Sequence, residues 1–252
     1  MTDRQNDAPS SQRLAKTYDA AFYANQMAGS LASAEITLRK LAPLMPDVRS
    51  VLDVGCGAGG WLKAAAVVFG GADVHGVDHP GAANGQTYLN PAEFSGVDLA
   101  QAFDLHRRFD LVISLEVAEH IAPERADVFV DNLTTHGPLV LFSAAAPRQG
   151  GTGHVNERWP SYWTEKFAAQ GFRRHDVVRP LIWDEDAVAS WYKQNAMLYV
   201  REDVDEFGAD VDDWGGRALV HPGQWMRATE PWGRKIARAL TGRKPSHDWR
   251  VD

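Results

Sequence analysis

The sequence predicts an α/β fold with a doubly wound, mostly parallel sheet, and three patterns support this prediction. Short apolar runs alternate with amphipathic helical stretches between residues 50 and 200. The first apolar run leads into a glycine-rich turn at residues 55–60. Acidic residues stand where the early runs end. Such alternation is typical of a parallel sheet that helices cover on both faces and that binds ligands at the carboxyl ends of its strands.

The individual elements are predicted from residue spacing and from residues that favour helix ends. The expected strands are residues 50–54, 74–77, 87–89, 109–114, 138–143, 177–182 and 196–200. The expected helices are residues 30–45, 61–69, 125–133 and 162–170. Ser30 is the predicted N-cap of the first helix, and Gly171 is the predicted residue that closes the last one.

We interpret the chain as a disordered tail, a helical cap, an α/β domain and a C-terminal extension, at residues 1–13, 14–48, 49–201 and 202–252. The tail is polar and has almost nothing to bury. The extension is expected to act as a lid or as an oligomer contact, for example in a homodimer. Within it, residues 224–240 have the pattern of an amphipathic helix that Pro231 and Gly233 interrupt.

Composition limits the partners and the compartment. The net charge of −7, from 26 basic and 33 acidic residues, disfavours a nucleic-acid partner held by bulk electrostatics. Cys56 is the single cysteine, so no disulfide can form within the chain, which fits a reducing compartment. No apolar run reaches the roughly 20 residues needed to span a bilayer, and the N-terminus has no run of the signal-peptide type. The expected location is the cytoplasm, away from membranes.

The glycine-rich turn GCGAGG at residues 55–60 has acidic neighbours that narrow the choice of ligand. Glycines let the backbone turn sharply and approach a ligand closely, and the helix that follows offers unpaired N–H groups. Asp53 lies in the strand just before the turn, where a carboxylate suits a ligand with an ammonium group better than a pyrophosphate, which disfavours NAD. Asp78, at the end of the second strand, can accept hydrogen bonds from ribose hydroxyls, and Asp98 can meet an adenine amino group.

Several stretches resemble known families. The segments DVGCGAGGWL, GVD and FDLVISLEVAEHI resemble motifs of class I S-adenosylmethionine-dependent methyltransferases, at residues 53–62, 76–78 and 109–121. The segments FYANQMAGSLASA, SAAAPRQGGTGHVNERWPSYW and WYKQN resemble a bacterial subgroup of methyltransferase-domain proteins, at residues 22–34, 143–163 and 191–195. The resemblance covers residues 48–200. It implies a Rossmann-like sheet of seven strands, one of them antiparallel, and S-adenosylmethionine as the cofactor.

The same resemblance implies roles for individual residues. The residues that it assigns to the cofactor, from the methionine end to the adenine, are Asp53, Gly55, Gly57, Asp78, Asp98 and Leu99. Asp53 and the two glycines would hold the methionine part, and Asp78 would hold the ribose. Asp98 and Leu99 would flank the adenine. Further candidate cofactor contacts at these strand ends are Cys56, His79 and Ser114.

A candidate metal site follows the strand at residues 109–114. Glu116, Glu119 and His120 are spaced i, i+3 and i+4, which places them on one face if the chain turns helical there. Two carboxylates and an imidazole suit Mg²⁺, Mn²⁺ or Zn²⁺, and His154 in the later glycine-rich loop could supply a fourth ligand. The pattern is similar to ubiquinone-biosynthesis O-methyltransferases and small-RNA 2′-O-methyltransferases, in which a divalent ion binds the acceptor hydroxyls.

Two mechanisms remain open for this cluster, besides a structural role. A neutral hydroxyl is a poor nucleophile, so a metal ion or a general base must help it to lose its proton. In the metal-free alternative, His154 or His120 is the base, and Glu116 is the third candidate catalytic group. In the structural alternative, Glu119 and His120 form an ordinary helix face.

The predicted function is O-methylation of a hydroxyl on a small molecule or a glycan. Trp159 and Tyr162, in the loop after His154, suit a sugar ring or a flat aromatic acceptor. Trp163 and Phe167, spaced i and i+4, are better interpreted as core. Methylation of RNA 2′-hydroxyls is an alternative, against which the acidic balance counts. A protein that binds the cofactor without catalysis is a further alternative.

Overall fold

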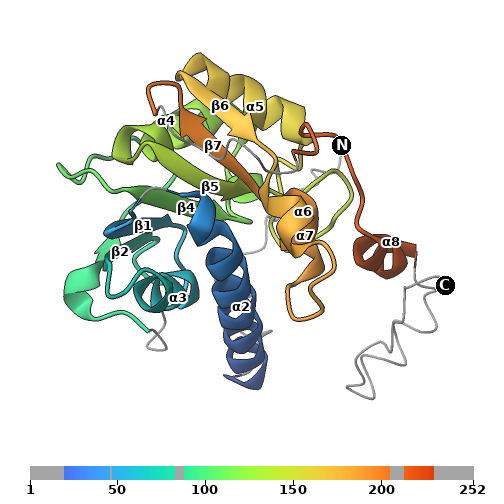
Figure 1. Ribbon diagram of the computed structural model, residues 1–252, viewed down its shortest axis with the longest axis horizontal. Helices are drawn as coiled ribbons and strands as arrows, with labels where there is room; N and C mark the ends of the chain where they lie inside the picture. The colour runs from blue at the N-terminus through green and yellow to red at the C-terminus, as the bar shows by residue number, and fades with distance from the viewer. Residues whose placement is uncertain (1–19, 46, 83–87, 205–212, 230–252) are drawn as a thin grey trace, which may run out of the picture.

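A seven-stranded sheet lies at the centre of the computed structural model, which describes residues 20–45, 47–82, 88–204 and 213–229 (Figure 1). Its strands are β1 (Ser50–Val54), β2 (Asp73–Asp78), β3 (Phe94–Gly96), β4 (Leu111–Leu115), β5 (Leu139–Ser143), β6 (Phe172–His175) and β7 (Met197–Arg201). The order in the sheet is β3-β2-β1-β4-β5-β7-β6. Only β7 runs antiparallel to its neighbours, so the predicted mostly parallel, seven-stranded sheet is confirmed.

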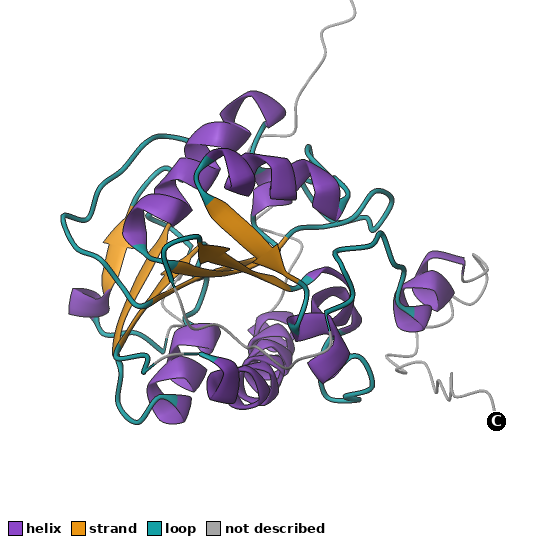
Figure 2. Ribbon diagram, turned by 45° about the horizontal axis from the view of Figure 1, so that its top comes forward, coloured by secondary structure: helices purple, strands orange, loops and turns teal. Residues whose placement is uncertain are grey.

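Helices cover both faces of this sheet (Figure 2). One face carries α2 (Ala20–Leu41), α3 (Gly60–Val68), α6 (Val178–Ile182) and α7 (Ser190–Asn195). The other face carries α4 (Ala126–His136) and α5 (Pro160–Ala169). The remaining helical segments are η1 (Ala42–Leu44), η2 (Pro91–Glu93), η3 (Ala118–His120), η4 (Pro123–Arg125) and α8 (Pro222–Thr229). None of the helices in the described ranges is both long and apolar enough to span a membrane.

The central strands are mostly apolar because both faces of the sheet are covered, and their polar residues Asp53, Ser114 and Ser143 lie near the carboxyl ends. In β4, Leu111 and Ile113 pack beneath α2 and α3, whereas Val112 packs beneath α4 and α5. Successive side chains of a strand point to opposite faces, so a strand buried on both faces has no polar alternation. These continuous apolar runs made β1, β4, β5 and β7 predictable from the sequence.

Two strand predictions are wrong. The third strand is β3 (Phe94–Gly96), not residues 87–89, of which residue 87 lies outside the described ranges. The apolar run at 177–182 is largely the short helix α6, and the strand before it is β6, with the sequence FRRH. As an edge strand, β6 pairs only with β7 and tolerates arginines, so its pattern is weak. A short apolar run such as 177–182 does not distinguish a buried helix from a strand.

The helix predictions differ mainly at the ends. Helix α2 begins at Ala20, so Ser30 lies inside it and is not its N-cap. The predicted helices at 61–69, 125–133 and 162–170 correspond to α3, α4 and α5. Gly171 follows α5 with φ +76° and donates its N–H to the Ala168 carbonyl at 3.0 Å, as predicted for a glycine that closes a helix.

Part of the C-terminal extension packs on α6 and α7 through a buried ion pair. The Arg179 guanidinium contacts both oxygens of Asp176, and both side chains have no solvent exposure. Arg179 also donates to the Arg217 carbonyl at 2.9 Å, and Asp176 accepts the Gly216 N–H at 2.8 Å. The ion pair therefore joins the fold to residues 213–217. The predicted disordered tail at 1–13 and the helix prediction beyond residue 229 lie outside the described ranges.

We expect Arg179→Met to destabilise the protein by about 3–5 kcal/mol, because it leaves the Asp176 carboxylate buried without its cation. Urea unfolding followed by circular dichroism measures the change. Arg173→Met is the control, because Arg173 is exposed on β6, and it should change stability by less than about 0.5 kcal/mol. Equal effects of the two substitutions would contradict a structural role for the buried pair.

Candidate active site

The cofactor half of the site begins where β1 ends at Val54. The backbone then turns through Gly55, at φ +86°, and Gly57, at φ +52°, before α3 begins at Gly60. A Cβ atom at Gly55 would lie 2.4 Å from a methyl group of Val117, so no larger residue fits there. A Cβ atom at Gly57 would meet nothing within 4 Å, which leaves open space beside the turn. The turn therefore packs tightly against the loop that follows β4 on one side and is open on the other.

Two carboxylates lie together at the ends of β1 and β2. Burial, and to a lesser degree the charge of Asp78, raise the pKa of Asp53, whose side chain is 3% exposed. Burial also raises the pKa of Asp78, although this carboxylate accepts N–H groups from Gly57 at 2.8 Å and from His79 at 2.6 Å. No residue within the described ranges donates a hydrogen bond to the Asp53 carboxylate. A buried acid pair of this kind favours a ligand with a positive charge.

The remaining cofactor candidates occupy different environments. Asp98 is exposed after β3, and the Val97 N–H beside it donates to the Asp78 carbonyl at 2.9 Å, which brings it to the same sheet edge. Leu99 is half-buried, and His79 is exposed. Cys56 is buried against Gly76, and burial raises the pKa of its thiol.

Ser114 does not lie where a cofactor contact requires it. Its side chain is fully buried within β4, and its hydroxyl donates to the Val54 carbonyl at 2.8 Å. The prediction of a direct contact is therefore corrected, and Ser114 joins the ends of β1 and β4.

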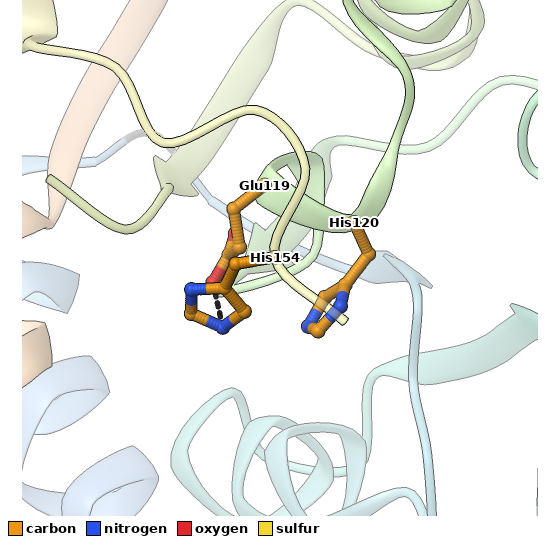
Figure 3. Close-up of side chains that lie close together, drawn as sticks. All are labelled: Glu119, His120 and His154. Carbon is orange, nitrogen blue, oxygen red and sulfur yellow. Dashed lines mark ion pairs between the residues drawn. The ribbon is translucent and has the colours of Figure 1, made fainter. Parts of the chain in front are cut away.

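The acceptor half brings three predicted ligands together, as Figure 3 shows. One side-chain nitrogen or oxygen atom each from Glu119, His120 and His154 lies within 4.8 Å of the others. His154 Nε2 is 3.9 Å from Glu119 Oε1, and the two imidazole rings are perpendicular with centroids 4.8 Å apart. The Glu119 carbonyl accepts the N–H groups of Val155 and Asn156, which holds the His154 loop against this turn.

The electrostatics of the cluster suit a cation or a proton. Burial, followed by the charge of Glu116, raises the pKa of Glu119 to about 8. Glu119 Oε2 is buried and has no hydrogen-bond partner in the described part of the chain. Burial also lowers the pKa of His120, which favours the neutral imidazole. A buried carboxylate oxygen without a described partner, beside two imidazoles, suits a metal ligand set or a protonated acid.

Glu157 orients His154, a role that the sequence pattern did not reveal. Its Oε1 lies 2.9 Å from His154 Nδ1. Burial tends to raise the pKa of Glu157, but the hydrogen bonds from His154 and from two backbone N–H groups outweigh it and lower the pKa. With Nδ1 held by this carboxylate, Nε2 faces Glu119. The same orientation serves a metal ligand or a general base.

Glu116 does not share a helical face with Glu119 and His120, so that prediction is wrong. It adopts φ +57°, and the chain turns into the 3₁₀ helix η3 only from Ala118. Its carboxylate instead accepts hydrogen bonds from Gln149 Nε2 at 2.5 Å and Asn195 Nδ2 at 3.1 Å. Burial raises the pKa of Glu116, and these hydrogen bonds act against the rise. Gln149 was missed from the sequence because its partners come from distant segments.

Two of the aromatic residues are core residues, as their i and i+4 spacing predicted, and a third is exposed. Trp163 and Phe167 are almost fully buried in the core beside Phe142, whereas Trp159 is 39% exposed at the start of α5. Of these side chains, Trp159 is therefore the one that an acceptor can reach.

Comparison with known proteins gives the family. Residues 23–177 match the methyltransferase-domain family. The sugar N-methyltransferase KedS8 from Streptoalloteichus sp ATCC 53650 is similar in structure, with a TM-score of 0.57, 19% identity and 81% of this chain and 98% of that chain covered. DesVI of Streptomyces venezuelae gives a TM-score of 0.55 and 16% identity, over 72% and 95% of the two chains. CalS10, an amino pentose methyltransferase from Micromonospora echinaspora, gives a TM-score of 0.53 and 17% identity, with 73% of this chain and 97% of that chain covered.

A search of curated proteins finds no match to the sequence. The match over residues 23–177 covers more than half of the chain, so the protein belongs to the methyltransferase-domain family and is a class I S-adenosylmethionine-dependent methyltransferase. Its cofactor is S-adenosylmethionine, whose sulfonium and ammonium groups are the positive charges that the acid pair favours.

We expect Asp53→Asn to weaken S-adenosylmethionine binding about tenfold or more, because the cofactor ammonium loses its charged partner. The same substitution should raise the Tm of the cofactor-free protein at neutral pH. Burial raises the pKa of Asp53 above its unfolded value, so the ionised carboxylate destabilises the free protein above the unfolded pKa. Calorimetric titration and thermal unfolding measure the two effects.

The gain in stability should disappear at low pH, where Asp53 is protonated in both the folded and the unfolded state. It should grow as the pH rises from the unfolded toward the folded pKa. Asp131→Asn, at an exposed position on α4, is the control and should change neither the affinity nor the Tm. Unchanged cofactor affinity in Asp53→Asn would refute the role of this carboxylate.

Proposed function

We propose that the protein transfers the methyl group of S-adenosylmethionine to a hydroxyl oxygen of a small molecule or a glycan, with a divalent metal ion at Glu119, His120 and His154. The single observation that carries the proposal is the meeting of these three side chains next to the loop that packs on the cofactor turn. A methyltransferase that acts on an amine or a carbon needs no such ligand set.

The residues present fit a divalent ion. Glu119 contributes a buried oxygen that lacks a partner among the residues that the structure describes, and the pKa of His120 is lowered by burial, which favours the neutral imidazole that can coordinate. Glu157 holds His154 by Nδ1, which is the usual outer support of a metal-bound histidine. Two imidazoles and one carboxylate favour Mn²⁺ or Zn²⁺ over Mg²⁺, which prefers oxygen ligands.

The reaction asks for positioning and for removal of one proton. The acceptor oxygen attacks the methyl carbon in line with the sulfonium, a C–O bond forms, the C–S bond breaks, and S-adenosylhomocysteine leaves as a neutral thioether. A divalent ion bound to the cluster would lower the pKa of the acceptor hydroxyl. With the ion bound, His154 Nε2 would serve as a ligand, and the proton of the acceptor hydroxyl would pass to solvent. Without a metal, His154 Nε2 would receive the proton, because Glu157 fixes the opposite ring nitrogen and stabilises the imidazolium. Glu116, between the cofactor turn and the amides, orients the acceptor.

Two features support a small molecule or a glycan as the acceptor. Trp159 exposes an aromatic side chain at the start of α5, close in sequence to His154. Aromatic faces bind sugar rings and flat phenols well. The net charge of −7 gives little attraction for RNA, so the alternative of a 2′-hydroxyl in RNA has less support.

N-methylation of an amino sugar is a second candidate function, favoured by the His154–Glu157 hydrogen bond. An amine must lose a proton before it can attack, and an imidazole supported by a carboxylate removes it without a metal. Two of the structurally similar proteins, KedS8 and CalS10, are described as sugar N- or amino pentose methyltransferases. In this candidate function, His154 is the base, and the carboxylates around it hold its imidazole in place.

Metal binding is tested first, without reference to turnover. Protein stripped with chelator is expected to bind one Mn²⁺ or Zn²⁺ ion in a calorimetric titration, and both His154→Ala and Glu119→Gln should abolish it, since each removes a ligand. Glu124→Gln is the control, because Glu124 is a nearby exposed acid. A titration without heat of binding in the unsubstituted protein would end the metal proposal.

Turnover is then measured as S-adenosylhomocysteine released with a panel of catechol, methyl glucosides and amino sugars. We expect hydroxyl acceptors to be methylated, and both EDTA and His154→Ala to reduce the rate about 100-fold or more, with Mn²⁺ restoring activity after EDTA. Turnover that survives EDTA but not His154→Ala would assign His154 as a metal-free base. Turnover with amino sugars alone would favour the second candidate function.

A further inference from the structure

A chain of amides, half-buried at Gln149 and buried at Gln194 and Asn195, connects Glu116 with the C-terminal extension. Gln149 Oε1 accepts hydrogen bonds from Asn195 Nδ2 at 2.8 Å and from Gln194 Nε2 at 3.4 Å. Gln194 Nε2 also lies 3.1 Å from Asn195 Oδ1. At the far end, the backbone N–H of His221 donates to Gln194 Oε1 at 3.0 Å. The exposed fractions of Gln194, Asn195 and His221 are 4%, 7% and 1%, so water contributes little at this end of the network.

The amide groups of the chain are oriented from the Glu116 carboxylate outward. The Glu116 carboxylate accepts hydrogen bonds from the amide NH₂ groups of Gln149 and Asn195, which therefore face it. Asn195 Nδ2 also donates to Gln149 Oε1, and the donor to Asn195 Oδ1 is Gln194 Nε2. Gln194 Oε1 in turn points outward and requires a donor of its own. The N–H of His221 meets that requirement, so the extension completes a network that the α/β domain alone leaves unfinished.

Gln194 is the residue at which the extension is attached to this network. Its side chain accepts the His221 N–H. Its backbone carbonyl accepts Arg179 Nη1 at 3.3 Å, and the same nitrogen donates to the Arg217 carbonyl. Both the main chain and the side chain of Gln194 are therefore fixed by residues 213–221 or by the ion pair that holds them. A shift of these residues moves Gln194 before it moves any other member of the network.

Glu116 lies where such a shift matters. It precedes Val117, whose methyl groups fill the space beside Gly55 of the cofactor turn. It also lies three residues before Glu119 of the candidate metal cluster. An error of about 1 Å in the placement of a group at such a junction can cost about 100-fold in rate.

We propose that Gln194 is a positioning residue, which couples the docking of residues 213–221 to the orientation of Glu116 at the acceptor end of the site. The proposal rests on the proposed function for the role of Glu116 in orienting the acceptor. It assigns the extension a part in completing the site from within the same chain.

The test compares Gln194→Met with Gln224→Met. Methionine matches glutamine in length and lacks hydrogen-bonding groups, so the first variant breaks the network with little change in packing. Gln224 is a matched control, because it is also buried, at 6% exposure, and lies on α8 outside the network. Gln194→Glu is the second variant. It retains an acceptor for the His221 N–H but has no donor for Gln149 and Asn195, so it should fail as Gln194→Met does.

Two readouts are measured at equal fractions of folded protein. The first is the pair of side-chain NH₂ signals of Gln149 and Asn195 in ¹H–¹⁵N spectra, assigned by their loss in Gln149→Glu and Asn195→Asp. The second is turnover on the best acceptor of the panel described above, together with S-adenosylmethionine affinity by calorimetry. We expect Gln194→Met to displace both NH₂ signals and to lower kcat between about 10- and 100-fold, with cofactor Kd changed less than about twofold.

The spectra decide the proposal even if no acceptor of the panel is methylated, which separates it from the proposed function. NH₂ signals of Gln149 and Asn195 that stay at their original positions in Gln194→Met would overturn the coupling. A fall in kcat that Gln224→Met reproduces, or one that parallels a loss of cofactor affinity, would reduce Gln194 to a general structural role and overturn the proposal equally.

Discussion

The burial of two carboxylates at the ends of β1 and β2 is the constraint on which the cofactor site depends. Asp53 is buried without a donor among the described residues, next to Asp78, whose own charge is only partly offset by two backbone N–H groups. Burial of these carboxylates destabilises the protein without its cofactor, and a bound cation offsets this effect. The site therefore favours a cationic ligand over a neutral or anionic one. S-adenosylmethionine carries positive charge on its sulfonium and its amino group, and the glycine turn brings the backbone close to it.

The two halves of the site are joined by direct packing, not by a linker. Val117 fills the place where a side chain at residue 55 would lie, so the cofactor turn and the loop after β4 fit only one another. Ser114 adds a hydrogen bond between β4 and the end of β1. Glu116 and Glu119 lie on the same loop as Val117, on either side of it. A change in either loop is therefore felt by both the methyl donor and the groups that would activate its acceptor.

The acceptor half is assembled from segments that are distant in the sequence. The carbonyl of Glu119 holds the backbone beyond His154, and the carboxylate of Glu116 is bonded to Asn195, 79 residues further along the chain. The His154 loop contributes both an imidazole and, through Glu157, the group that fixes its orientation. Polar networks of this kind specify one geometry only when every member is satisfied, and here the last donor comes from beyond β7.

The sequence by itself determined the central strands, three of the helices on the sheet, the glycine turn and the acids beside it. These features depend on periodicity, turn chemistry and the order of strand ends, which neighbouring residues fix. It also identified Glu119, His120 and His154, because short spacing and a glycine-rich loop mark them. Only the tertiary structure decided that β6 is FRRH, that Glu116 turns away from Glu119 and His120, and that Ser114 is buried. It alone revealed Glu157 and Gln149 as partners, because the hydrogen bonds that give them a role join side chains whose proximity no local pattern encodes.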